Sequence, residues 1–129
     1  MAIQYSVASR NAQLDAHATT LGANFTTKIF TGSPPANCAA ADSGTELVSF
    51  TACNFASASS GTMALTGTPE TATAGATGTA AHFRMYNGAT CHVQGTVATS
   101  AADMTVNNAS ITSGQTVNIN DYTLTAANA

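Results

Sequence analysis

The pattern of apolar and polar residues begins with one helical segment. From Ser6 to Leu21 the chain has neither Gly nor Pro, and Gly22 stands where a C-terminal cap belongs. The apolar positions follow spacings of three, four and seven, while Arg10, Gln13 and His17 fall largely outside this stripe: Ile3, Val7, Leu14, Ala18 and Leu21. We therefore predict a short amphipathic helix in an N-terminal segment, residues 1–24. This helix either lies on its own domain or acts as a docking or coiled-coil helix in an oligomer. Because the segment has fewer than three heptads, the pattern favours a helix that lies on its own domain.

After Gly22 the pattern changes to short extended runs that are rich in β-branched and aromatic residues. The low-complexity run 71–80, with two glycines and no large apolar residue, favours a loop. The expected strands lie at 25–31, 46–51, 61–66, in a hairpin within 81–95, and at 103–107, 115–120 and 122–125. About eight short strands predict a mainly β fold: a single-domain β-sandwich or jelly-roll-like barrel over residues 25–129. The apolar phase slips by one residue at Asn120-Asp121, which predicts a bulge or tight turn there.

The hairpin is marked by Asn87-Gly88. A two-residue loop at these positions would mix apolar and polar side chains on both faces of the hairpin. A three-residue loop, 87–89, separates them. This register puts four apolar residues on the buried face and four polar ones on the other: Phe83, Met85, Cys91 and Val93 against His82, Arg84, His92 and Gln94.

Charge is scarce in this chain of 129 residues. Charged residues make up 7%, hydrophobic residues 44%, and the net charge is −3. Ordinary domains carry about 25% charged residues. A surface with so few charges is expected to be buried in part against partner proteins.

The low charge also excludes classes of partner. The three basic residues, Arg10, Lys28 and Arg84, lie far apart, so we expect neither nucleic-acid binding nor a polybasic membrane patch. No apolar run approaches the length of a membrane span. The first residues lack the pattern of a signal peptide, so we expect synthesis in the cytoplasm.

Candidate catalytic chemistry is sparse. Cys38, Cys53 and Cys91 fit no zinc motif and are expected to be reduced. Cys91 and His92 are adjacent on a strand and point to opposite faces, so they do not form a nucleophile–base pair. His82 and His92 share a face, yet no third metal ligand is evident. We expect no enzyme activity, no cofactor and no metal.

Four stretches of the chain carry a resemblance: 10–16 (RNAQLDA), 30–45 (FTGSPPANCAAADSGT), 78–86 (GTAAHFRMY) and 107–116 (NNASITSGQT). They resemble a family of small tailed-bacteriophage proteins that are usually encoded among the head genes. The resemblance extends over the whole chain, and its motifs are structural rather than catalytic. Within such gene neighbourhoods, a β-sandwich of this size resembles a capsid decoration, or cement, protein.

The resemblance implies the major capsid protein as partner, the capsid surface of the virion as location, and synthesis in the host cytoplasm. We expect a dimer or trimer that bridges capsid subunits. The alternatives are a tail or head-fibre component, a carbohydrate-binding module, for which the scattered tyrosines and absent Trp are unfavourable, and a cryptic hydrolase. The candidate partner contacts are Ile3, Tyr5, Val7, His82, Arg84 and His92.

Overall fold

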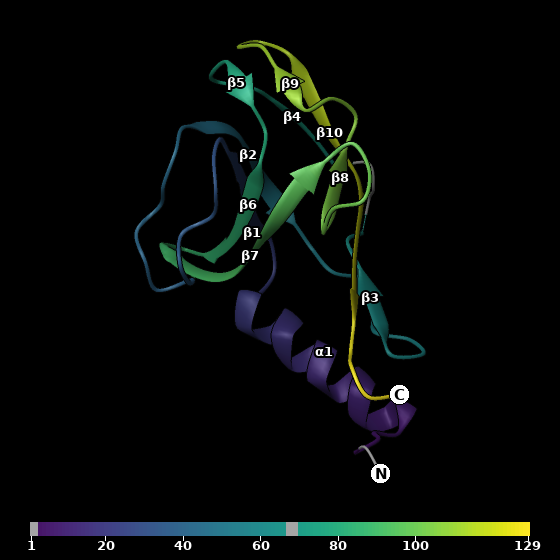
Figure 1. Ribbon diagram of the computed structural model, residues 1–129. Coiled ribbons are helices and arrows are strands. Elements are labelled where there is room, and N and C mark those ends of the chain that lie inside the picture. The colour runs from purple at the N-terminus through teal and green to yellow at the C-terminus, as the bar shows by residue number, and fades with distance from the viewer. Residues whose placement is uncertain (1–2, 67–69) are drawn as a thin grey trace.

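The computed structural model describes residues 3–66 and 70–129 and is mainly β with one N-terminal helix (Figure 1), as the sequence predicts. The helix α1 spans Val7–Leu21. The strands are β1 (Phe25–Phe30), β2 (Glu46–Cys53), β3 (Thr62–Ala64), β4 (Glu70–Thr73), β5 (Gly78–Thr79), β6 (His82–Asn87), β7 (Thr90–Ala98), β8 (Met104–Val106), β9 (Ser110–Ile111) and β10 (Thr116–Thr125).

Eight of these strands form one curled sheet, a half-barrel, in the order β2-β1-β6-β7-β8-β10-β3, with β4 also paired to β10. The β7–β8 pair is parallel and the other pairs are antiparallel. The curl brings β2 near the segment after β4, where the Gly75 amide donates to the Leu47 carbonyl at 2.9 Å. The strands β5 and β9 form a separate ribbon at the far end from α1 (Figure 1).

The hydrophobic core fills the inside of the curl. Alternate residues of the central strands point inward, which is the period of two that a half-buried sheet requires. The most buried members include Ile29, Val48, Phe83, Met85, Met104, Val117 and Ile119. This core positions β6 and β7, whose opposite faces carry the site described below.

The helix begins and ends where the sequence predicts. The Ser6 hydroxyl accepts from the Ser9 amide at 3.1 Å, and Gly22, at φ +77°, donates to the Ala18 carbonyl at 2.9 Å. Leu14 and Leu21 are buried against the chain's own sheet domain, as the favoured alternative requires. Among residues 3–66 and 70–129, no helix is long and apolar enough to span a membrane.

The predicted apolar stripe is only partly correct. Val7 is exposed and Ile3 precedes the helix, whereas Arg10, expected outside the stripe, is buried. Its Nε and Nη2 donate to the Ala126 carbonyl at 3.1 and 2.9 Å. The guanidinium lies against Gly61, where a Cβ would fall 2.3 Å from its carbon. An arginine with a buried stem and satisfied donors packs like an apolar residue, so hydropathy alone misplaces it.

One prediction about the strands needs correction and another is confirmed. The run 71–80, expected to be a loop, contains part of β4 and all of β5, because β10 and β9 supply the pairing partners for small residues of weak intrinsic preference. The phase slip at Asn120-Asp121 is a bulge, as predicted, and β10 continues through it.

The predicted hairpin register is wrong. Asn87 pairs with Thr90 around a two-residue turn, Gly88-Ala89, and Tyr86 pairs with Cys91. A bulge then shifts the ladder, so that Met85 pairs with Val93. Phe83 and Met85 are buried as predicted, but the bulge puts Cys91 on the face of Tyr86 instead of theirs.

Candidate functional site

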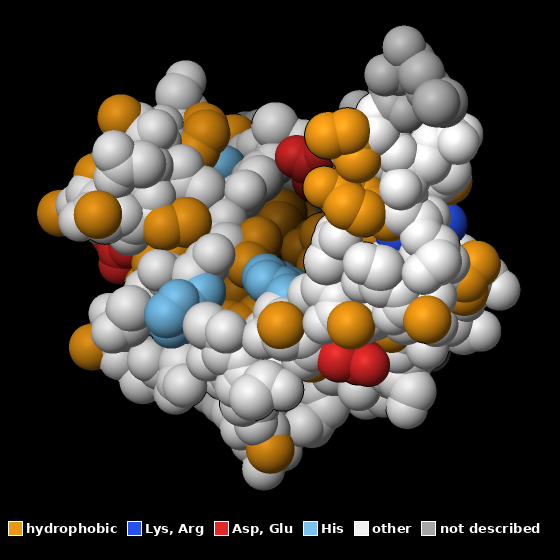
Figure 2. Space-filling view, turned by 90° about the horizontal axis from the view of Figure 1, so that it is seen from below, with side chains coloured by type: hydrophobic (Ala, Val, Ile, Leu, Met, Phe, Trp, Pro, Cys, Tyr) orange, Lys and Arg blue, Asp and Glu red, His pale blue; other side chains and the backbone are white. Residues whose placement is uncertain are grey.

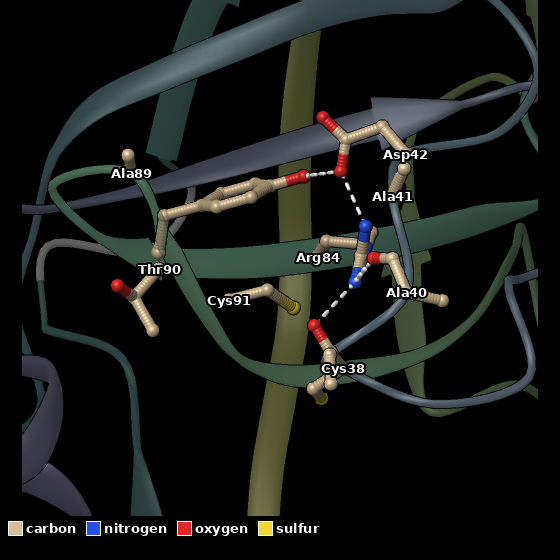
Figure 3. A pocket seen from close by; sticks show the side chains of 10 residues that line it. Cys38, Ala40, Ala41, Asp42, Arg84, Ala89, Thr90 and Cys91 are labelled. Carbon is tan, nitrogen blue, oxygen red and sulfur yellow. Dashed lines mark hydrogen bonds and ion pairs between the residues drawn. The ribbon is translucent and has the colours of Figure 1, made fainter.

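The loop between β1 and β2, residues 31–45, folds over the outer face of β6; we call it the covering loop. At its centre lies the guanidinium of Arg84, whose residue is 1% exposed (Figure 3). The Nη2 atom donates to the carbonyl oxygens of Cys38 at 2.9 Å and Ala40 at 3.0 Å, and Nη1 pairs with the Asp42 carboxylate. A buried guanidinium needs acceptors for its donors, and here the loop supplies them to both terminal nitrogens, through its backbone at Nη2 and through Asp42 at Nη1.

The Asp42 carboxylate joins this cluster to Tyr86. The same oxygen that pairs with Arg84 accepts the Tyr86 hydroxyl proton. Burial alone would raise the pKa of Asp42, but hydrogen bonds from Tyr86 and Arg84, together with nearby positive charge, outweigh it and lower the pKa. Burial and the Asp42 carboxylate both raise the pKa of Tyr86. These bonds join the covering loop to β6, while the Arg84 Nε atom is buried without a hydrogen-bond partner.

This arrangement predicts a pH dependence of stability. The pKa of Asp42 is lower in the folded chain than the unfolded value of about 4, so its contribution is present above pH 4 and is lost as the pH falls through the folded value. The side chain is 43% exposed, so we expect a modest effect, about 2–4 °C in Tm. Below about pH 4, Tm of the native chain should fall more steeply than Tm of Asp42→Asn. Parallel curves in thermal melts would contradict this assignment.

His82 and Arg84, expected to face solvent as partner contacts, are instead covered. His82 is 0% exposed, its Nδ1 lies 2.7 Å from the Gly32 carbonyl oxygen, and its ring stacks on Phe30 with centroids 5.2 Å apart. The prediction of a surface position fails for both residues because a distant loop supplies the cover that strand alternation cannot reveal.

The third polar candidate, His92, lies at the hairpin bulge and is partly exposed. His92 acts on His17 of α1 through space. Burial lowers the pKa of His17, and electrostatic repulsion from His92 lowers it further. The view from below shows histidine side chains beside a hollow with a hydrophobic floor (Figure 2). Cys91 has different surroundings, because it lines the cavity beside Arg84, whereas His92 does not.

The apolar candidates near the N-terminus are exposed as expected. Ile3 is 71%, Tyr5 40% and Val7 52% exposed, and these are the exposed large hydrophobic residues of the described chain. The backbone holds this segment in place, since the Tyr5 amide donates to the Asn128 carbonyl at 2.6 Å. Figure 1 shows the two ends of the chain side by side below the sheet. We call residues 3–7 the N-terminal apolar segment.

The surface of the described residues includes two cavities near the predicted strands of the hairpin. One, of about 640 Å³, lies between the covering loop and the hairpin, and its lining includes Cys38, Asp42, Arg84, Tyr86 and Cys91. The other, of about 430 Å³, lies beside Phe83 and includes Asp103 and Asp121. Asp103 is already engaged, because its Oδ2 accepts the Thr96 amide at 2.9 Å. Within residues 3–66 and 70–129 no group of three or more side chains is placed to hold a metal.

Sequence reasoning missed Asp42 and Tyr86 as partners of Arg84. Asp42 lies in a stretch of small residues that gives no periodic signal, and its partner is far away in the sequence. Alternation with Phe83 and Met85 puts Arg84 on the opposite face of the strand, and nothing in the local pattern shows that this face is covered.

The comparisons with protein-family models, with curated proteins and with solved structures found no match to this chain.

Proposed function

We propose that this protein decorates a phage capsid and stabilises it by bridging subunits of the major capsid protein. The observation that carries the proposal is the N-terminal apolar segment, in which Ile3, Tyr5 and Val7 are exposed at alternate positions of the sequence. Exposed apolar residues gathered in one place are typical of a surface that a partner covers. The resemblance to small head-gene proteins supplies the identity of that partner.

The charge distribution supports a protein partner. All three basic side chains are held by the chain itself: Arg10 by Ala126, Lys28 by Glu46 at 3.0 Å, and Arg84 by Asp42. In the part of the chain that the structure describes, no basic side chain is left unpaired, and the core of a protein interface is likewise depleted of charged residues. A protein that binds only the assembled shell stabilises it at every copy by its binding free energy.

The first test compares capsids with and without the protein. Particles that lack it should assemble but release their DNA at a lower temperature and under milder osmotic shock. The measurement is DNA release during heating, with added purified protein expected to restore the resistance. Equal heat resistance of the two kinds of particle would exclude the cement role.

The contact surface has its own test. Ile3→Asp combined with Val7→Asp should weaken capsid binding at least about 10-fold, because charges would replace apolar contacts. Tm of the isolated protein should change little, since both residues are exposed. Ala52→Asp, at an exposed position of β2, is the matched control and should bind as the native protein does. Equal binding by all three proteins would place the contact elsewhere.

A tail or head-fibre component is the second candidate, because the same apolar segment would suit another virion partner. Imaging of the particles with a copy number separates the two. Many copies over the head support decoration, whereas a few copies at one vertex or on the tail support the alternative.

A further inference from the structure

Two of the three cysteines line the same cavity. Cys38 belongs to the covering loop and Cys91 to β7, and both border the cavity that contains the Arg84 guanidinium. Figure 3 shows the Cys91 sulfur pointing from its strand toward the part of the loop that carries Cys38. Both residues are partly exposed and both thiols are free.

Two structural features hold the thiols in this position. The bulge in β7 pairs Cys91 with Tyr86, which puts its side chain on the face that the loop covers. The Cys91 sulfur also donates to the Val93 carbonyl at 3.3 Å. On the other side, Arg84 fixes the loop at Cys38 itself, through the bond from Nη2 to the Cys38 carbonyl at 2.9 Å. The two cysteines are therefore held near each other by the strand pairing of Cys91 and by the bond from Arg84 to the Cys38 backbone, as well as by the contact of the Cys91 sulfur.

We propose that Cys38 and Cys91 form a reversible dithiol–disulfide site, which on oxidation joins the covering loop to the hairpin. The oxidant is a small-molecule disulfide such as oxidised glutathione. One cysteine thiolate attacks the disulfide, which forms a mixed disulfide and releases one thiolate. The second cysteine thiolate then attacks the protein sulfur of that mixed disulfide, forms the Cys38–Cys91 bond and releases the second thiolate. Two protons pass from the cysteines to the two released thiolates.

The surroundings predict a slow reaction near neutral pH. Burial raises the pKa of Cys91, and a hydrogen bond with the Cys38 thiol raises it further, while the Arg84 charge opposes this. Because the thiolate is the nucleophile, a raised pKa leaves little reactive form at pH 7 and more as the pH rises. The site would remain reduced in a cytoplasm and oxidise on longer exposure outside it. The reaction belongs to the isolated chain and does not depend on the proposed function.

Cys53 provides an internal reference. It is 0% exposed, lies in the main core, and its sulfur donates to the Phe50 carbonyl at 3.6 Å. A disulfide reagent cannot reach it without unfolding. The proposal therefore predicts selective loss of two thiols and retention of the third.

The experiment treats the isolated native protein with oxidised glutathione at about pH 7 and about pH 9, then alkylates it under denaturing conditions. Mass spectrometry should show loss of two hydrogen atoms and one alkylated cysteine, and peptide mapping should join the peptides of Cys38 and Cys91. The rate should rise at least about 10-fold from the lower to the higher pH, and dithiothreitol should reverse the change.

Variants separate the outcomes. Cys38→Ser and Cys91→Ser should each stop at the mixed disulfide and keep one glutathione, whereas Cys53→Ala should form the cross-link like the native protein. Two stable glutathione adducts on the native chain, a disulfide that joins two chains, or no reaction of Cys38 and Cys91 would each overturn the proposal. If Cys53→Ala does not fold, the peptide map of the native protein decides by itself.

Discussion

Phe83→Ala is expected to destabilise the protein by about 3–5 kcal/mol, the range for removing a core aromatic side chain. Phe83 is 1% exposed and packs edge-on against Tyr122, with ring centroids 5.3 Å apart. It also fills the space beside Gly95, where a Cβ would lie 2.8 Å from the Phe83 ring. Since a domain of this kind has only about 5–15 kcal/mol in total, Tm should fall by about 10–20 °C.

His92→Ala is the matched control on the neighbouring strand. His92 is partly exposed and lies at the bulge, so its removal should cost no more than about 1 kcal/mol. Thermal melting and urea unfolding of the two isolated variants measure the difference. A protein that loses its fold on His92→Ala but tolerates Phe83→Ala would show that the two faces of the hairpin are exchanged.

Arg84→Met carries the second largest expected effect. Methionine keeps much of the stem but leaves the carbonyl groups of Cys38 and Ala40 without the Arg84 donor, and it leaves the Asp42 carboxylate with the Tyr86 hydroxyl but without its cation. Removing one partner of a buried ion pair costs about 3–5 kcal/mol, and the partial exposure of Asp42 puts this case near 3 kcal/mol. The covering loop should detach first, because Arg84 is its main anchor.

Lys28→Met is the control for the loss of a positive charge on the same sheet. Lys28 pairs with Glu46 at 3.0 Å, but both side chains are about a third or more exposed, so the change should cost about 0.5 kcal/mol. Limited proteolysis should cut within the covering loop in Arg84→Met and leave it intact in Lys28→Met. Equal Tm values and equal cleavage of the two variants would remove the anchoring role.

Several features of the fold depend on neighbouring residues and could be predicted from the sequence. The helix begins at the hydroxyl of Ser6 and ends at Gly22, because capping involves atoms within one turn. The bulge at Asn120-Asp121 follows from the slip of apolar phase, since a strand must return its apolar side chains to the core.

The hairpin register could not be derived in this way. The alternation of Phe83, Met85, Cys91 and Val93 fits a regular three-residue loop, but the chain forms a two-residue turn and adds a bulge. Both solutions keep Phe83 and Met85 in the core, so core burial does not choose between them. They differ in the position of Cys91, which faces the covering loop only in the bulged form.

The sequence by itself determined the fold class, the helix with its caps, and a surface poor in charge. The tertiary structure alone decided that His82 and Arg84 are buried and that Cys38 lies near Cys91. The physical reason is the range of the interactions. Strand alternation says which side chains share a face, but whether that face meets water depends on the covering loop. That loop lies over β6 because its carbonyl groups and Asp42 satisfy the guanidinium of Arg84, a contact between distant parts of the chain.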